Sequence, residues 1–109
     1  MVINKIMKNL QDILKANGFT KTYVRTFKVK HNSSLPVYMQ LIEVILEDIK
    51  IGKLEAGDIL PSLHLYSTTL CIAKGTVEKA YRKLKTMGYV SSWPGKGYFV
   101  LDTKLEIVN

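Results

Sequence analysis

Cysteine is almost absent from this chain, and long apolar runs are missing altogether. The 109 residues include one cysteine, Cys71, which excludes an internal disulfide and a thiolate-rich metal site. No stretch approaches the roughly 20 apolar residues that a membrane-spanning helix needs. Charged residues also interrupt the N-terminal segment, which therefore lacks the apolar middle of a signal peptide; they are Lys5, Lys8, Asp12 and Lys15. We therefore expect a cytoplasmic protein.

Acidic residues are scarce as well. The chain has 9 of them against 16 lysines and arginines, which gives a net charge of +7. Such an excess favours an anionic partner, with nucleic acid as the first expectation and an acidic membrane surface as the competitor. Residues 1–34 hold seven basic residues and one acidic residue, and therefore six of the seven net charges. Apolar residues make up 47%, so the chain should fold as one domain around a modest core.

Side chains that perform catalysis are few and scattered. His64 and Cys71 lie seven positions apart, with no orienting acid and no third ligand beside them, so they indicate neither a nucleophile pair nor a metal site. The stretch Gly95-Lys96-Gly97 is too short for a nucleotide-binding loop. We therefore predict that the protein is not an enzyme and uses no metal or cofactor.

Residues 1–34 are predicted to form an extension that contains a helix and a strand. Apolar residues recur there at helical spacing, with charges on the opposite side. They are Ile3, Ile6, Met7, Leu10, Ile13 and Leu14. The stripe is as wide as an ordinary core face, so we favour packing on the domain or on a second subunit over membrane binding or targeting. Because large exposed apolar patches are rare on soluble monomers, this extension is a candidate dimerisation element.

Residues 22–30 show the alternating pattern of a β-strand. Tyr23, Phe27 and Val29 supply the apolar side, which Arg25 interrupts. Two roles stay open for this segment: a solvated, lysine-rich strand, or a basic arm that contacts phosphate.

The region 35–101 shows three helices followed by a hairpin. Apolar spacing predicts helices over 36–51, from Pro61-Ser62 to about Leu70, and over 73–87. Strands over 89–93 and 97–101 flank the turn Pro94-Gly95-Lys96-Gly97, and Ile59-Leu60 is a short strand expected to pair with them. The predicted fold class is therefore α+β, mainly α: a winged helix-turn-helix of three helices and a two-stranded wing, with a tail over 102–109.

The third helix has two contrasting faces. Its apolar stripe comprises Val77, Ala80, Tyr81, Leu84 and Met87; its outer face carries Lys74, Thr76, Lys79, Arg82, Lys83 and Lys85. A solvated basic face and an ordinary hairpin would explain each half separately, whereas contact with DNA explains their adjacency. The single acid, Glu78, is expected to pair with Arg82 four residues on, with hydrogen bonding to a cytosine as the alternative.

These motifs resemble the GntR family of bacterial winged-helix transcription regulators. The resemblance covers Leu35 to Leu101 without a gap. It is carried by Pro36-Val37-Tyr38, Gly52-Lys53-Leu54, Gly57-Asp58, Leu60-Pro61-Ser62, Leu70, Lys74-Gly75-Thr76-Val77, Ala80-Tyr81, Leu84, Gly88-Tyr89-Val90, Gly95-Lys96-Gly97 and Phe99-Val100.

The resemblance implies that the third helix docks in the major groove and the wing tip lies at the minor groove. Lys74 and Gly75 would then meet base edges or nearby phosphate, Thr76 a phosphate, and Lys79 the same side one turn later. Lys96 and Gly97 would form the wing tip. Ser62, as N-cap of the second helix, is a further candidate because free amides at a helix N-terminus bind phosphate. His64 occupies a position where the family usually has a DNA-contacting arginine.

Several positions depart from the family pattern. Ala73 replaces a capping serine or threonine, which removes about 1 kcal/mol of capping. Cys71 replaces a glycine and is expected to adopt a left-handed backbone conformation. Lys74 replaces an arginine and should discriminate guanine less sharply. The chain most resembles the short, YtrA-like branch of the family, with its extra helix before the DNA-binding domain; an effector, if one exists, is not indicated.

We therefore predict a sequence-specific DNA-binding transcription regulator, acting as a repressor and as a homodimer on double-stranded DNA in the bacterial cytoplasm. The alternative is a winged-helix module that joins a protein or nucleic-acid complex without operator specificity.

Overall fold

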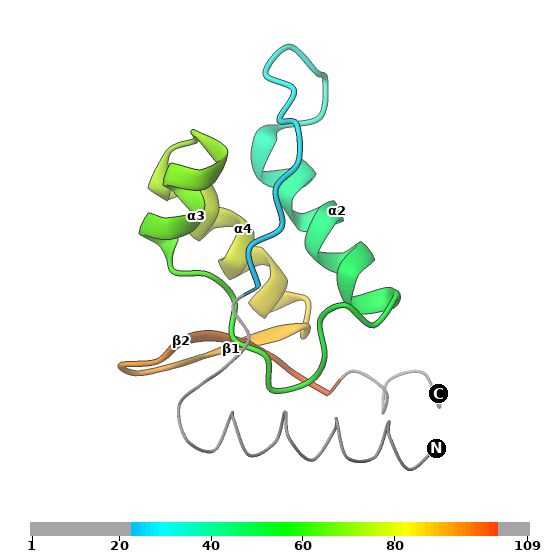
Figure 1. The fold of residues 1–109 in the computed structure, drawn as a ribbon, viewed down its shortest axis with the longest axis vertical. Coiled ribbons are helices and arrows are strands. Elements are labelled where there is room, and N and C mark those ends of the chain that lie inside the picture. The colour runs from blue at the N-terminus through cyan, green and yellow to red at the C-terminus, as the bar shows by residue number, and fades with distance from the viewer. Residues whose placement is uncertain (1–22, 103–109) are drawn as a thin grey trace, which may run out of the picture.

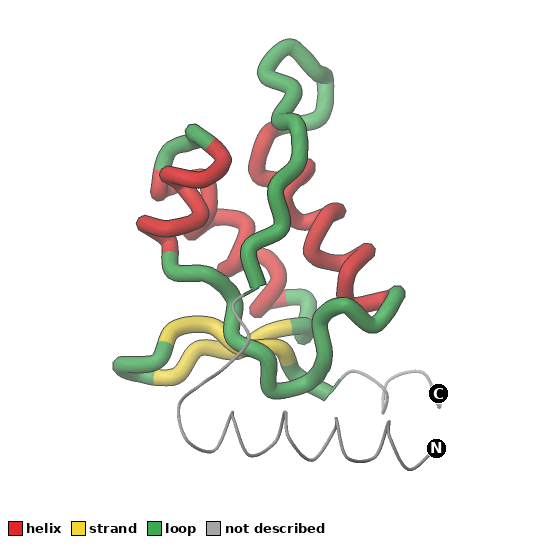
Figure 2. Tube along the Cα trace, viewed as in Figure 1, coloured by secondary structure: helices red, strands yellow, loops and turns green. Residues whose placement is uncertain are grey.

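The computed structural model describes residues 23–102, which fold into three helices and a two-stranded antiparallel sheet (Figure 1). The helices are α2 (Val37–Lys50), α3 (Leu63–Leu70) and α4 (Lys74–Thr86), and the strands are β1 (Val90–Trp93) and β2 (Gly97–Val100). In Figure 2 the three helices, in red, group on one side of the yellow sheet. The predicted winged-helix architecture is confirmed. The helix predicted from the stripe between Ile3 and Leu14 lies outside the described residues.

Helix α4 is the element against which the others pack, because α2, α3 and β1 all contact it. Its predicted apolar stripe is confirmed: Val77, Ala80, Tyr81 and Leu84 are buried. Met87 is the exception, since it follows the last helical residue and is exposed. The buried Tyr81 hydroxyl donates a 2.8 Å hydrogen bond to the Pro61 carbonyl oxygen, and burial raises its pKa well above the usual range. This bond ties α4 to the start of α3.

Two residues shape the ends of α3. The Ser62 hydroxyl oxygen accepts a 3.0 Å hydrogen bond from the Leu65 amide, so Ser62 is the N-cap. Cys71 ends the helix with φ 57 and ψ 46, the left-handed conformation expected of it. A side chain carrying Cβ costs roughly 1–2 kcal/mol there. The Ile72 amide then donates to the Ser67 carbonyl oxygen over 3.0 Å, which allows the chain to turn directly into α4.

A short segment of the connection between α2 and α3 also pairs with the sheet. Strands β1 and β2 pair in the register Val90↔Val100 to Trp93↔Gly97, and Ile59 forms an antiparallel bridge with Phe99. The Leu60 amide also donates to the Tyr98 carbonyl oxygen over 2.9 Å. The predicted pairing of Ile59-Leu60 with the wing is confirmed, and it fixes the wing to the helical part of the domain.

The strand predicted over 22–30 is wrong for the residues that the structure describes. Residues 23–30 are extended but join no sheet; they lie along α2 (Figure 1). The side-chain amide of Gln40 explains why, because it takes the place of a neighbouring strand. Its Oε1 accepts from the Lys30 amide at 2.9 Å, and its Nε2 donates to the Lys30 carbonyl oxygen at 2.8 Å.

A fully buried carboxylate, Asp48 on α2, holds this extended segment in place. Arg25 forms an ion pair with Asp48, and the Tyr23 hydroxyl donates a 2.6 Å hydrogen bond to Asp48 Oδ2. Burial and the bond to Asp48 raise the pKa of Tyr23. The Tyr66 hydroxyl on α3 donates to the Arg25 carbonyl oxygen at 2.8 Å, and burial raises the pKa of Tyr66 to about 12. These contacts join the extended segment to both α2 and α3.

We predict that Arg25→Ala lowers the free energy of unfolding by about 2 kcal/mol. Removing one member of a buried ion pair costs about 3–5 kcal/mol, and the partial exposure of Arg25 reduces that figure. The matched control is Arg82→Ala, which breaks an exposed arginine–glutamate pair and should cost at most about 0.5 kcal/mol. Urea unfolding followed by circular dichroism measures both. Equal losses in the two variants would contradict the role given to Asp48.

Candidate nucleic-acid interface

The outer face of α4 is basic and open to solvent. Lys74, Lys79 and Lys83 are exposed, opposite the buried stripe. The expected pair between Glu78 and Arg82 is confirmed, with 3.2 Å between Glu78 Oε1 and Arg82 Nη2. Because that pair neutralises the only acid of the helix, lysine ammonium groups dominate the outward charge. This face therefore attracts a polyanion.

The first turn of α4 carries the smallest side chains of that face. Ala73 is the N-cap and supplies no side-chain hydrogen bond, as its residue type predicts. Lys74 and Gly75 follow and are exposed, whereas Thr76 is half-buried. A Cβ placed on Gly75 would have no atom within 4 Å, and its φ is not positive. Neither packing nor backbone conformation within the domain requires glycine here, so the position leaves room for a group from outside.

The start of α3 places two more of the predicted residues on the surface. Ser62 and His64 are both exposed. The Ser62 oxygen is used in capping, while a hydroxyl retains a proton that it can donate to phosphate. Helix N-termini attract anions because their amides point outward and the helix dipole is positive there. The two predicted roles of Ser62 are therefore chemically compatible.

Lys79 is exposed, but its ammonium group contacts a side chain of α2. Its Nζ lies 4.2 Å from the centroid of the Tyr38 ring, within the range of a cation–π contact. Sequence reasoning placed Lys79 on the outer face but missed Tyr38 as its partner, because nothing in the pattern links residues 41 positions apart. The contact fixes the ammonium group close to the junction of α2 and α4.

The wing tip holds the remaining predicted residues. Gly95 and Gly97 have φ +78 and +91, values that glycine alone adopts readily. Between them, the Lys96 amide donates to the Trp93 carbonyl oxygen over 2.9 Å, and Lys96 is exposed. Figure 1 shows α3 and the β1–β2 turn projecting on the same side of the molecule, at the left of the view. Helix α3 and the wing tip thus lie toward one side.

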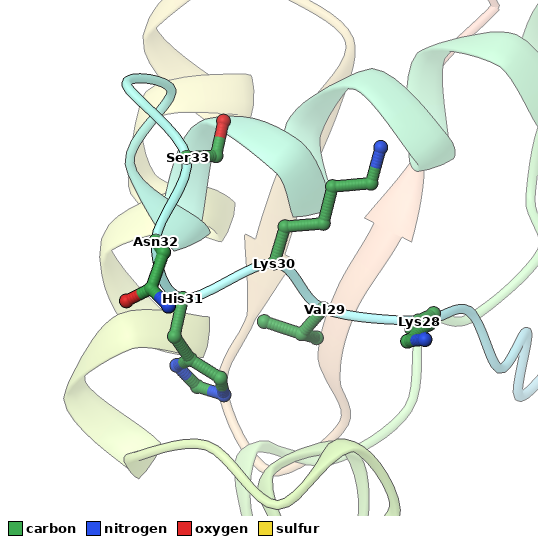
Figure 3. A pocket seen from close by; sticks show the side chains of 6 residues that line it. All are labelled: Lys28, Val29, Lys30, His31, Asn32 and Ser33. Carbon is green, nitrogen blue, oxygen red and sulfur yellow. The ribbon is translucent and has the colours of Figure 1, made fainter.

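A shallow hollow lies near the start of α2. Figure 3 shows the six side chains that line it, and they point in different directions. They are Lys28, Val29, Lys30, His31, Asn32 and Ser33. Within residues 23–102, no group of three or more histidine, cysteine or acidic side chains is placed to hold a metal ion. The same residues include no helix with the length and apolar character needed to cross a membrane.

Comparison with known proteins identifies the region that contains these features. The family model described as "Bacterial regulatory proteins, gntR family" matches residues 37–100. The HTH-type transcriptional repressor YtrA of Bacillus subtilis is 32% identical over 75 residues, which are 69% of this chain and 58% of that protein. Among curated relatives, the chain spans from 14% of the length of one to 63% of another.

Solved structures agree with the family match. YtrA from Sulfolobus acidocaldarius, a GntR-family transcription factor, superposes with a TM-score of 0.65 at 30% identity, over 74% of this chain and 89% of that one. The DNA-binding domain AraR(DBD), solved in complex with operator ORX1, has a TM-score of 0.62 at 26% identity, over 73% and 99% of the two chains.

We predict that Lys74→Ala and Lys96→Ala each weaken duplex binding and reduce the slope of log K against log salt by about 0.9. That is the change expected when one phosphate contact, with its released counterion, is lost. The matched control is Lys53→Ala, an exposed lysine in the loop after α2. Anisotropy titrations at several salt concentrations measure all three variants. If the slope changes in neither Lys74→Ala nor Lys96→Ala, these lysines do not contact phosphate.

A second prediction uses the open space at Gly75. Gly75→Ala should raise the free energy of unfolding by up to about 1 kcal/mol, because alanine favours helix. The same variant should weaken duplex binding about tenfold or more, equivalent to about 1.4 kcal/mol, because the added methyl group separates α4 from the duplex. Ala73→Ser serves as control: it should add stability through capping without weakening binding. A Gly75→Ala protein with undiminished affinity would show that α4 does not approach the duplex at this residue.

Proposed function

The chain belongs to the gntR family of bacterial regulatory proteins, and from that premise we propose that it binds double-stranded DNA sequence-specifically and represses transcription. The observation that carries this proposal is the first turn of α4, where the exposed Lys74 adjoins a glycine that the domain itself does not require. A repressor name in the Bacillus relative and the operator complex of the AraR domain support it.

In the proposed complex, α4 enters the major groove with its N-terminal turn leading. A major groove about 12 Å wide admits a helix. Lys74 then reaches guanine acceptors or a nearby phosphate, and Gly75 permits the backbone to approach closely. Thr76 donates to a phosphate beside it. Lys79, oriented by Tyr38, contacts the backbone one turn later.

The flanking elements fix the register of that helix. Ser62 and the amides at the start of α3 bind a phosphate on one side of the groove. Lys96 and Gly97 bring the wing tip to the minor groove on the other side. His64 lies on α3 where an arginine would add a permanent charge and a fork of donors for a bidentate contact. Phosphate contacts therefore position the domain, while few side chains remain to distinguish bases.

We further propose that the protein acts as a homodimer, with residues 1–34 contributing to the interface. A single domain of this size offers one short reading helix, and two such helices one DNA turn apart, about 34 Å, convert two weak contacts into one strong one. The apolar residues that recur at helical spacing in the sequence between Ile3 and Leu14 are of the kind that self-association buries. Because its target is chromosomal DNA, we place the protein in the cytoplasm.

Selection of binding sites from random duplexes tests the proposed function. We expect enrichment of a palindrome whose half-sites are centred about one helical turn apart, and a dimer mass by light scattering. A scrambled duplex of equal composition, at the same salt, is the control. Enrichment of no sequence, with equal affinity for the scrambled duplex, would contradict sequence-specific regulation and favour a winged-helix module within a larger complex. A single half-site bound by a monomer would contradict the dimer alone.

A further inference from the structure

Trp93 is the most exposed of the large apolar residues in the described part of the chain, with 59% of the residue's surface accessible. It is also the single tryptophan of the protein. It occupies the last position of β1, at the base of the wing turn. A tryptophan buried in a core would need no further explanation, but one held at the tip of a projecting hairpin does, because exposing an indole to water is unfavourable.

Two neighbouring side chains hold the indole without covering it. The Phe99 ring lies 5.7 Å away between centroids and is inclined at 51°. The Lys96 ammonium lies 5.4 Å from the centroid of the indole. Directly opposite in the strand register is Gly97, which has no side chain to shield the ring. The indole is therefore preorganised, and much of it remains open to a partner.

The wing tip presents a flat apolar ring, the indole, beside the positive charge of Lys96. Lys96 suits a phosphate, and the indole suits an apolar surface close to that phosphate. The minor groove of duplex DNA presents both, since its walls are deoxyribose rings and its edges are phosphates. At about 6 Å wide, it admits single side chains, and apolar wedges from proteins enter it and partly separate base steps.

We propose that Trp93 enters the minor groove beside the half-site contacted by α4, with its indole against deoxyribose and Lys96 bound to the adjacent phosphate. This inference rests on the proposed DNA binding and adds a contact that discriminates between base pairs. The exocyclic amino group of guanine projects into the minor groove and would meet the indole. The wing therefore favours A·T pairs at the position that it occupies.

Binding measurements with substituted proteins form the first part of the test. The probe is a fluorescein-labelled duplex of about two helical turns that carries the selected palindrome. Trp93→Ala should weaken binding about tenfold, Trp93→Phe less, and the salt slope should stay unchanged because the indole is neutral. The matched control is Ile51→Ala, which removes another exposed apolar side chain just after the last residue of α2; it should leave affinity unaltered. Trp93→Ala binding within twofold of the unsubstituted protein would overturn the inference.

The second part locates the contact in the minor groove. Inosine lacks the minor-groove amino group of guanine but keeps its major-groove acceptors. Inosine·cytosine pairs at the wing position should therefore bind like A·T pairs, and guanine·cytosine pairs more weakly. The unsubstituted protein should show this preference and Trp93→Ala should lose it. A preference that persists in Trp93→Ala, or that inosine does not relieve, would overturn the assignment of the contact to this indole.

The emission of the single tryptophan provides an independent signal. Saturating duplex should change its intensity and protect it from acrylamide; unchanged emission at full occupancy would overturn the inference. Anisotropy of the labelled duplex reports binding separately. An absence of binding in that signal would mean that the proposed function fails, whereas binding without an indole response would mean that only the Trp93 contact fails.

Discussion

The burial of one face of α4 is the constraint on which the rest of this domain depends. Val77 and Leu84 are inaccessible to solvent because α2, α3 and β1 all pack on that face. A helix with one face buried has its rotation fixed, so the opposite face is fixed as well. The position of Lys74 and Gly75 at the surface is therefore a consequence of the core. Substitutions in that core would act on the proposed DNA binding by rotating or loosening α4, without any contact with the duplex.

Asp48 extends the same constraint to a segment that has no regular structure. A buried carboxylate requires partners, and Arg25 and Tyr23 supply them from a stretch preceding α2. The bond from Tyr66 to the Arg25 carbonyl oxygen then connects that stretch to α3. Residues 23–30 are thereby joined to two helices through side chains. Replacing this arrangement by apolar residues of similar volume need not destabilise the domain, so its specific effect is to determine where the segment lies.

Three residues near the start of α4, on the proposed binding surface, are unfavourable for local stability. Ala73 leaves the start of α4 without a side-chain cap, Gly75 lowers helix propensity, and Cys71 adopts a left-handed conformation. All three lie between the end of α3 and the first turn of α4. The core interactions of α4 offset these costs, and the residues concerned leave the approach to the helix unobstructed.

The sequence by itself determined the features that depend on local periodicity and backbone preference. Apolar spacing located the three helices, Ser62 marked the start of α3, and Gly95 and Gly97 marked the wing turn, because each signal acts within a few residues. Only the tertiary structure decided the rest. The alternating pattern of 22–30 suggested a strand, but the partner of Lys30 is a glutamine on α2, and no local rule selects it. The Asp48–Arg25 pair joins residues 23 positions apart, and the exposure of Trp93 depends on a glycine across the hairpin. Periodicity predicts which face of an element is apolar, whereas which groups meet across that face depends on how the elements pack.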